Sequence, residues 1–167
     1  MTKNTTIRPC KKDENFSEIS KLYLKTWKSA YKDLLPQKLL VQLNEKTWSP
    51  QKRWQNTLIA ENSSNRIIGV CSFVPTRSDM FSNFGEIYSI YIDSAYQHMG
   101  TGSQLLKQAL DKLKQNGYHS VFLWVLYNNI PAIRFYRKMG FKTIGKTRID
   151  KSKLGEIKES AMSIYLK

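Results

Sequence analysis

The sequence predicts one α/β domain with a mixed β-sheet, and three observations lead to this fold class. Strand-like runs are grouped in the middle of the chain, between residues 57 and 92. From residue 86 onward strands and helices alternate, which is the pattern of βαβ units. No repeat, low-complexity stretch or linker divides the chain, so a single domain covering residues 1–167 is expected.

Hydrophobic periodicity and chain-breaking residues predict the order of the elements. The expected strands cover residues 5–10, 57–61, 66–74, 86–92, 120–126, 141–148 and 156–166. The expected helices cover residues 14–31, 34–43, a short segment from 49 to 54, 102–116 and 129–139. The order is therefore one strand, then helices, then three strands, then two helix–strand repeats and a last strand.

Local signals support several of these elements. Asp13 is the expected N-cap of the first helix, and Pro36 lies near the first turn of the second. Residues 62–65 (NSSN) form a polar turn between two strand-like runs, which predicts a hairpin. Gly117 ends the amphipathic helix that precedes it. The strand at 120–126 (SVFLWVL) is almost wholly apolar, as strands buried on both faces are.

The composition indicates a basic globular protein. The net charge of +14 is spread evenly, since residues 1–84 hold 14 basic and 7 acidic side chains and residues 85–167 hold 13 and 6. Such a surface attracts polyanions. The sequence shows no signal peptide and no run of roughly 18 apolar residues that would span a membrane. Cys10 and Cys71 lie far apart and outside any CxxC spacing, so a reducing cytoplasm is the expected location.

The loop at residues 97–102 (QHMGTG) stands between a strand and an amphipathic helix. This arrangement suits an anion, because the first turn of a helix has unpaired N–H groups and a partial positive charge. Gly100 and Gly102 let the backbone approach phosphate oxygens closely. On these residues alone, a plain glycine turn is the alternative interpretation.

Two familiar phosphate loops do not match this segment. A P-loop requires Lys and then Ser or Thr after its last glycine, whereas Ser103 and Gln104 follow Gly102. A Rossmann fingerprint requires three glycines and an acidic residue after a second strand.

A third pattern does match. Residues 90–106 resemble the acetyl-coenzyme A motif of the GNAT-superfamily N-acetyltransferases, Arg/Gln-x-x-Gly-x-Gly/Ala after a strand. Residues 129–141 (NIPAIRFYRKMGF) resemble the family's second motif, Asn-x-x-Ala-x-x-Phe-Tyr-x-x-x-Gly-Phe. The motifs stand in the family's order, one helix and one strand apart. The resemblance follows the element order over residues 5–166 and is specific from 86 to 142.

The resemblance implies a GNAT fold, with a mixed central sheet of about seven strands and about four or five flanking helices. The sheet would be splayed between its fourth and fifth strands. The resemblance also implies acetyl-CoA as the cosubstrate, bound by the loop and by the edge of the fourth strand. The residues assigned to this donor site are Ile90, Tyr91, Ile92, Gln97, His98, Met99, Gly100, Thr101, Gly102, Ser103 and Asn129.

Two of these residues carry a further expectation. Asn129 would contact the pantetheine arm or orient the site, and a helix N-cap is its local alternative. The backbone N–H of Ile92 would stabilise the oxyanion formed during acyl transfer.

Acetyl transfer to an amine requires proton transfer to and from the reacting groups. An amine with a pKa near 10.4 is almost fully protonated at neutral pH, and the cation cannot attack a thioester. A base is therefore useful, and the resemblance places it at Glu86 and places the acid that protonates the leaving thiolate at Tyr136. The alternative interpretation of Glu86 is a solvated acid at the start of a strand. The alternative interpretation of Tyr136 is an aromatic side chain packed in the core. Strand alternation would place four residues on one face: Glu86, Tyr88, Ile90 and Ile92.

The acceptor amine is not identified by the sequence. In this fold the first helices and the loop before the fourth strand line the acceptor groove. The expected lining residues are Trp27, Tyr31, Tyr88 and Trp124, and helical spacing makes Trp27 and Tyr31 neighbours. Carboxylates for a polyamine are present but do not cluster in sequence: Asp33, Glu45, Asp79 and Glu86. A small amine, a polyamine, an amino sugar and a peptide or protein amine all stay open.

Two other functions also stay open. One is a degenerate relative that binds coenzyme A as a sensor, against which the intact Glu86 and Tyr136 argue. The other is a nucleic-acid-binding module, suggested by the net charge and by the basic residues around Phe135 and Tyr136. No metal is predicted, because His98 and His119 are isolated. The expected partner is the amine-bearing acceptor, with no membrane and no favoured nucleic acid, and a homodimer stays open.

Overall fold

The computed structural model describes residues 4–76, 78–152 and 155–167. Its strands are β1 (Thr6–Pro9), β2 (Thr57–Glu61), β3 (Ile67–Pro75), β4 (Gly85–Ile92), β5 (Ser120–Leu126), β6 (Lys142–Ser152) and β7 (Gly155–Tyr165). Its α-helices are α1 (Phe16–Ala30), α2 (Gln37–Leu40), α3 (Thr101–Gln115) and α4 (Ile130–Lys138). Three 3-10 segments are η1 (Pro50–Asn56), η2 (Asp79–Phe81) and η3 (Ser94–Tyr96).

The seven strands form one mixed sheet in the order β1-β2-β3-β4-β5-β7-β6. The pair β4–β5 is parallel and the other pairs are antiparallel. The parallel pair follows from the helical crossover through α3, since parallel neighbours cannot be joined by a tight turn. The predicted fold class, an α/β domain with a seven-stranded mixed sheet, is confirmed.

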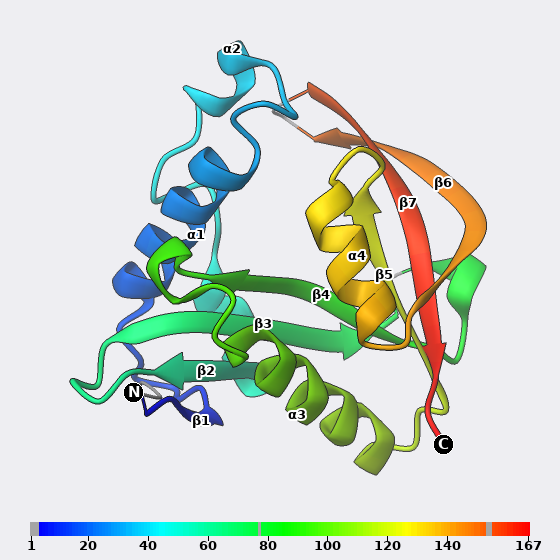
Figure 1. The fold of residues 1–167 in the computed structure, drawn as a ribbon, viewed down its shortest axis with the longest axis horizontal. Coiled ribbons are helices and arrows are strands. Elements are labelled where there is room, and N and C mark those ends of the chain that lie inside the picture. The colour runs from blue at the N-terminus through cyan, green and yellow to red at the C-terminus, as the bar shows by residue number, and fades with distance from the viewer. Residues whose placement is uncertain (1–3, 77, 153–154) are drawn as a thin grey trace.

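The sheet opens between β4 and β5. The two strands pair only at Gly85↔Val121 and Glu86↔Phe122, whereas β5 pairs with β7 along its whole length. Figure 1 shows the result, with β1 to β4 running across the view and β5, β7 and β6 rising steeply beside them. Within the part of the chain that the structure describes, the rest of β4 beyond Glu86 therefore has no strand partner on its β5 side.

Both faces of the sheet are covered. The largest core cluster lies under α3, where Leu105, Leu106 and Leu113 are fully buried against the strands. On the other face, α1 packs Ile19, Leu22 and Tyr23 onto β2 and β3. The leucines of α2 and its flanks form a further cluster with Leu126 of β5 and Ile157 of β7. This last cluster joins the N-terminal helices to β5 and β7. In Figure 1, α2 lies at the top of the view, near the upper end of β7.

Two expectations about the N-terminal helices need correction. Asn15, not Asp13, caps α1, and its side chain accepts a hydrogen bond from the Glu18 N–H at 3.3 Å. The preceding turn is held by Glu14, whose carboxylate accepts from the Lys11 N–H, so the helix begins after it. The helix expected at 34–43 is only Gln37–Leu40, and it begins after Pro36 because Pro36, with ψ of 136°, is extended rather than helical. The short helical segment expected from Ser49 onward is present, as the 3-10 segment η1.

The expected alternation along β4 is also wrong. The β3–β4 register shifts between Ser72 and Phe73, where Ser72 is opposite Ser89 and Phe73 is opposite Ile87. The intervening Tyr88 is thus an extra residue, a β-bulge that reverses the alternation after it. Consequently Ile90 and Ile92 pack on the α3 side with Ile87, whereas Tyr91 packs on the α1 side. Glu86 does not share a face with Ile90 and Ile92.

Candidate active site

A cleft of about 1030 Å³ opens where β4 and β5 diverge. Its walls come from α1, β4, β5, the loop before α3, α4 and the β6–β7 hairpin. All of the predicted site residues line it except Met99, which is 53% exposed, and Thr101, which is buried in the first turn of α3. One cleft therefore brings together the residues predicted for the donor, for catalysis and for the acceptor.

The donor end of the cleft is the start of α3. Gly100 has φ of 85°, a left-handed conformation that glycine adopts freely, and it is the N-cap of the helix. The first bond of α3 runs from the Gln104 N–H to the Gly100 carbonyl at 3.0 Å. The N–H groups of residues 101–103 precede that bond and are directed out of the helix start. These N–H groups fit the pyrophosphate of coenzyme A.

Asp93 fixes this loop to the rest of the domain. Its buried carboxylate accepts hydrogen bonds from Lys25 Nζ of α1 at 3.0 Å, from Arg66 at 3.2 Å and from the Ala95 N–H at 3.0 Å. Burial alone would raise the pKa of Asp93, but the Ala95 hydrogen bond and the two cations outweigh it and hold the pKa below its ordinary value. No local pattern in the sequence indicates Asp93, because Lys25 and Arg66 are far away in the sequence.

Replacing Asp93 with Asn should destabilise the protein in a pH-dependent way. Because the folded pKa is depressed, the charge of Asp93 stabilises the fold above its ordinary pKa of about 3.8, and this stabilisation is lost as the pH falls. We expect a loss of about 1–2 kcal/mol at pH 7, since both cations are more than half exposed. Urea unfolding of the wild type and of Asp93→Asn, at pH 7 and near pH 3, measures this loss in the free energy of unfolding. A difference in stability that does not narrow in acid would contradict the role of the charge.

The open edge of β4 presents backbone groups to the cleft. The Asp93 N–H donates to the Ile68 carbonyl of β3 at 2.8 Å, so by strand alternation the N–H groups of Ile92 and Ile90 point the other way. In agreement, the Ile92 carbonyl accepts from Gln97 Nε2 at 3.2 Å on that side. The Ile92 N–H therefore faces the opening, as its predicted oxyanion role requires. An extended pantetheine arm fits this unpaired edge.

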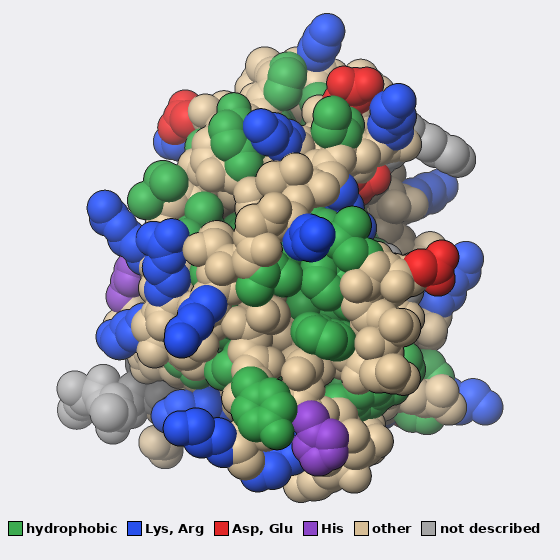
Figure 2. Space-filling view, turned by 90° about the vertical axis from the view of Figure 1, so that its right-hand side faces the viewer, with side chains coloured by type: hydrophobic (Ala, Val, Ile, Leu, Met, Phe, Trp, Pro, Cys, Tyr) green, Lys and Arg blue, Asp and Glu red, His purple; other side chains and the backbone are tan. Residues whose placement is uncertain are grey.

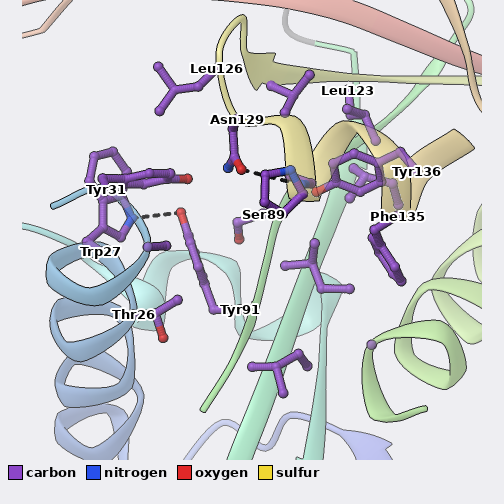
Figure 3. A pocket seen from close by; sticks show the side chains of 18 of the residues that line it. Thr26, Trp27, Tyr31, Ser89, Tyr91, Leu123, Leu126, Asn129, Phe135 and Tyr136 are labelled. Carbon is purple, nitrogen blue, oxygen red and sulfur yellow. Dashed lines mark hydrogen bonds between the residues drawn. The ribbon is translucent and has the colours of Figure 1, made fainter. Parts of the chain in front are cut away.

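Helix α4 forms the opposite wall. Asn129 caps it, accepting from the Ala132 N–H at 3.3 Å, and it also lines the cleft, so the cap leaves the predicted contact with the pantetheine arm possible. Tyr136 directs its hydroxyl into the cleft, as Figure 3 shows. Burial, followed by the influence of Tyr31 and Cys71, raises the pKa of Tyr136 far above its ordinary value. Its hydroxyl therefore keeps its proton throughout the physiological pH range.

Glu86 lies at the point where the two strands part. It is 2% exposed, lines the cleft and is the β4 residue opposite Phe122 of β5. A strand-start acid in solvent would not be buried in this way, so the solvated interpretation of Glu86 is wrong.

Aromatic side chains of α1 and β4 form the acceptor side. The indole N–H of Trp27 donates to the Tyr91 hydroxyl at 2.9 Å, as drawn in Figure 3. Trp27 and Tyr31 are neighbours, with ring centroids 4.7 Å apart at a steep angle. The pKa of Tyr31 is raised to about 12 by burial and by the charge of Glu159. The guanidinium of Arg53 stacks over the ring of Tyr88, with Arg53 Cζ 3.7 Å from the ring centroid.

The β6–β7 hairpin adds charged residues that the sequence analysis missed. Arg148, Asp150 and Glu159 line the cleft, and Arg148 Nε donates to Glu159 at 2.6 Å. Of the carboxylates considered earlier, only Glu86 lines it. Pairing of β5 with β7 and of β7 with β6 brings these distant residues to the cleft.

The face of the molecule that carries β6 and β7 has a diffuse charge. Figure 2 shows Lys and Arg side chains spread over the side on which β6 and β7 lie, without one continuous basic patch. In the described ranges, no helix is long and apolar enough to cross a membrane. Over the same residues, no three His, Cys, Asp or Glu side chains are grouped to hold a metal.

The fold and the cleft define a class of protein: an acyltransferase with a coenzyme A site on a splayed sheet. Comparison with known proteins agrees with this class. Residues 16–141 match the acetyltransferase (GNAT) family. N-acetyltransferase YuaI of Bacillus subtilis is 31% identical over 137 residues, which cover 79% of this chain and 77% of YuaI.

Two solved structures share the fold. The PaiA N-acetyltransferase of Thermoplasma acidophilum, in complex with coenzyme A, has a TM-score of 0.71 at 17% identity, covering 98% of this chain and 99% of its own. The protein yncA of Salmonella typhimurium, with its cofactor acetyl-CoA, has a TM-score of 0.70 at 22% identity, covering 98% and 95%. The chain therefore belongs to the GNAT acetyltransferase family, and acetyl-CoA is its cosubstrate.

Proposed function

We propose that this protein transfers the acetyl group of acetyl-CoA directly to a primary amine of a small acceptor. The observation that carries the proposal is the placement of Glu86 and Tyr136 in one cleft, on the strand β4 and on the helix α4 that flanks the opening. Acetyl-CoA supplies an acetyl group activated as a thioester. The free, buried thiols of Cys10 and Cys71 support the expected cytoplasmic location.

Glu86 is proposed as the base. Its carboxylate accepts a proton from the acceptor ammonium, directly or through water, and leaves a neutral amine that can attack. Its burial at the junction of β4 and β5, where the open edge of β4 begins, supports this role. The N–H of Ile92 is proposed to stabilise the oxyanion, because it faces the same opening.

Tyr136 is proposed as the acid. Its Oη gives a proton to the departing sulfur, and the raised pKa keeps that proton available before the reaction. Asn129, at the start of the same helix, is proposed to hold the pantetheine arm, and the N–H groups of residues 101–103 the pyrophosphate.

Replacing Gly102 with Ala should weaken donor binding without weakening the fold. A Cβ there would lie 3.5 Å from Phe135 Cζ and 3.7 Å from Ile92 Cγ1, which are ordinary contacts. Alanine also favours a helix over glycine by about 1 kcal/mol. The methyl group would nevertheless stand at the helix start, so we expect the KM for acetyl-CoA to rise about tenfold. A lower melting temperature, or an unchanged KM, would contradict this.

A thiol-release assay tests the proposed function. Purified protein is incubated with acetyl-CoA and a panel of monoamines, diamines, amino sugars, amino acids and N-terminal peptides, and free coenzyme A is measured. Acceptor-dependent release supports the proposal, and mass spectrometry of the product shows which amine carries the acetyl group. Binding of acetyl-CoA without release on any acceptor would favour a coenzyme A sensor instead.

A further inference from the structure

We infer that Arg148 and Trp124 form a carboxylate-binding subsite at the acceptor end of the cleft. The acceptor is then a small molecule that carries both an amine and a carboxylate, such as an amino acid. This inference rests on the proposed acetyl transfer, because it names the acceptor of that reaction. It assigns a role to the charged hairpin residues that the mechanism does not use.

Arg148 is oriented in advance for a ligand. Its Nε donates to Glu159 at 2.6 Å, and its guanidinium carbon lies 4.5 Å from the centre of the Trp124 ring. These two contacts fix the plane of the guanidinium. Among the described residues, its terminal nitrogens Nη1 and Nη2 make no hydrogen bond, although Arg148 lines the cleft. A planar guanidinium held in this way suits the two oxygens of a carboxylate.

Trp124 provides a second unpaired donor. Its indole Nε1 is buried and has no hydrogen-bond partner within residues 4–76, 78–152 and 155–167. Buried donors are almost always paired in folded proteins, so this one calls for an acceptor atom. Trp124 lines the cleft and lies against Arg148. Two neighbouring donors without acceptors point to an anionic oxygen ligand.

The subsite lies within the reach of one small molecule from Glu86. Glu86 is opposite Phe122, and Trp124 follows two residues later on the same face of β5, roughly 7 Å along the strand. The aromatic contacts of Phe81 with both Phe122 and Trp124 confirm the shared face. An acceptor can therefore place its amine near Glu86 and its carboxylate near Arg148.

The opposing interpretation is a site for a polyamine, since Glu86, Asp150 and Glu159 all line the cleft. Glu159 already forms an ion pair with Arg148, however. Asp150 lies two residues farther toward the hairpin tip, next to Ile157, and so farther from Glu86. The leucine cluster between α2 and Ile157 also bounds this end of the cleft, which favours a small acceptor.

The test compares acceptors that differ only in the carboxylate. Thiol release is measured with phenylalanine, phenylalaninamide and phenethylamine, with leucine, leucinamide and isoamylamine, and with putrescine and spermidine. We expect the amino acids to have the highest kcat/KM, by about tenfold or more. In Arg148→Gln the KM for the amino acids should rise about 10- to 100-fold, whereas the KM for the carboxylate-free amines should change little.

Three variants complete the experiment. Arg148→Lys keeps the charge without the planar fork and should recover only part of the loss. Trp124→Phe keeps the ring without the N–H and should raise the KM for amino acids more than for amines. Lys146→Ala removes an exposed charge from β6 outside the cleft and should leave the kcat/KM and the KM of every acceptor unchanged. Preference for putrescine or spermidine, or equal effects of Arg148→Gln on acids and amines, would overturn the inference.

A binding measurement separates this inference from the proposed function. Equilibrium dialysis of phenylalanine and leucine against protein saturated with coenzyme A reports the subsite without turnover. Binding that is lost in Arg148→Gln supports the subsite even if no acetyl transfer is seen, in which case the proposed function has failed. Absence of binding to the wild type overturns the subsite, even if other amines are acetylated.

Discussion

The variant Tyr136→Phe is expected to lose acetyl transfer by a factor of about 10²–10³ in kcat. The change removes only the hydroxyl, which directs its proton into the cleft, and keeps the ring packed against Phe135 and Phe141. Because the acid acts on the leaving sulfur, the KM for acetyl-CoA should change little. Steady-state thiol release, with dialysis of coenzyme A as a check on binding, measures the effect.

The pH dependence gives this prediction a second readout. Burial raises the pKa of Tyr136, so the neutral, proton-bearing form persists to higher pH than in an exposed tyrosine. Wild-type activity should therefore not fall as the pH approaches 10, the ordinary tyrosine value. Tyr118→Phe is a matched control, since Tyr118 packs on the same core but does not line the cleft. Equal losses in the two variants would show that packing, not proton transfer, is affected.

The variant Glu86→Gln is expected to lower kcat/KM at pH 7 by a factor of about 10²–10³, because the acceptor ammonium then loses its proton only to solvent. The loss should depend on pH. An aliphatic amine with a pKa near 10.4 becomes neutral on its own in alkali, so the ratio of wild-type to variant rates should shrink between pH 7 and pH 10. The rates of the wild type and of Glu86→Gln, measured with one acceptor from pH 7 to pH 10, test this expected change in their ratio.

Glu156→Gln is the control for loss of a carboxylate. Glu156 is an exposed residue of β7 and does not line the cleft, so its replacement should leave the rates unchanged. A ratio for Glu86→Gln that stays constant with pH would show that Glu86 supports the structure of the β4–β5 junction rather than deprotonating the amine.

The features that the sequence predicted well are local ones. The order strand, glycine loop, amphipathic helix is written within residues 85–115, and the structure has these elements in that order, with Gly100 as the N-cap of α3. Asn129 and Tyr136 lie seven residues apart on one helix, so helical geometry alone brings both near the cleft. Glu86 was predicted from the family resemblance, which implies a carboxylate at the start of the fourth strand.

The features that the sequence predicted poorly depend on contacts between distant segments. The bulge at Tyr88 arises from the register of β3 against β4, and it reversed the expected faces of Ile90 and Tyr91. Helix α2 begins later than expected because the extended Pro36 is its N-cap, and its leucines pack on Ile157 of the distant β7. Arg148 reaches the cleft only through the pairing of β6 with β7, which no local pattern indicates.

The central claim is that one splayed cleft holds acetyl-CoA between β4 and α4 with its sulfur at Tyr136. A crystal structure of the protein with coenzyme A tests it most directly. We expect the pantetheine arm along Ile90 and Ile92, the pyrophosphate at residues 101–103 and the sulfur within about 3.5–4 Å of Tyr136 Oη. A coenzyme bound elsewhere, or a sulfur facing away from Tyr136, would contradict the account.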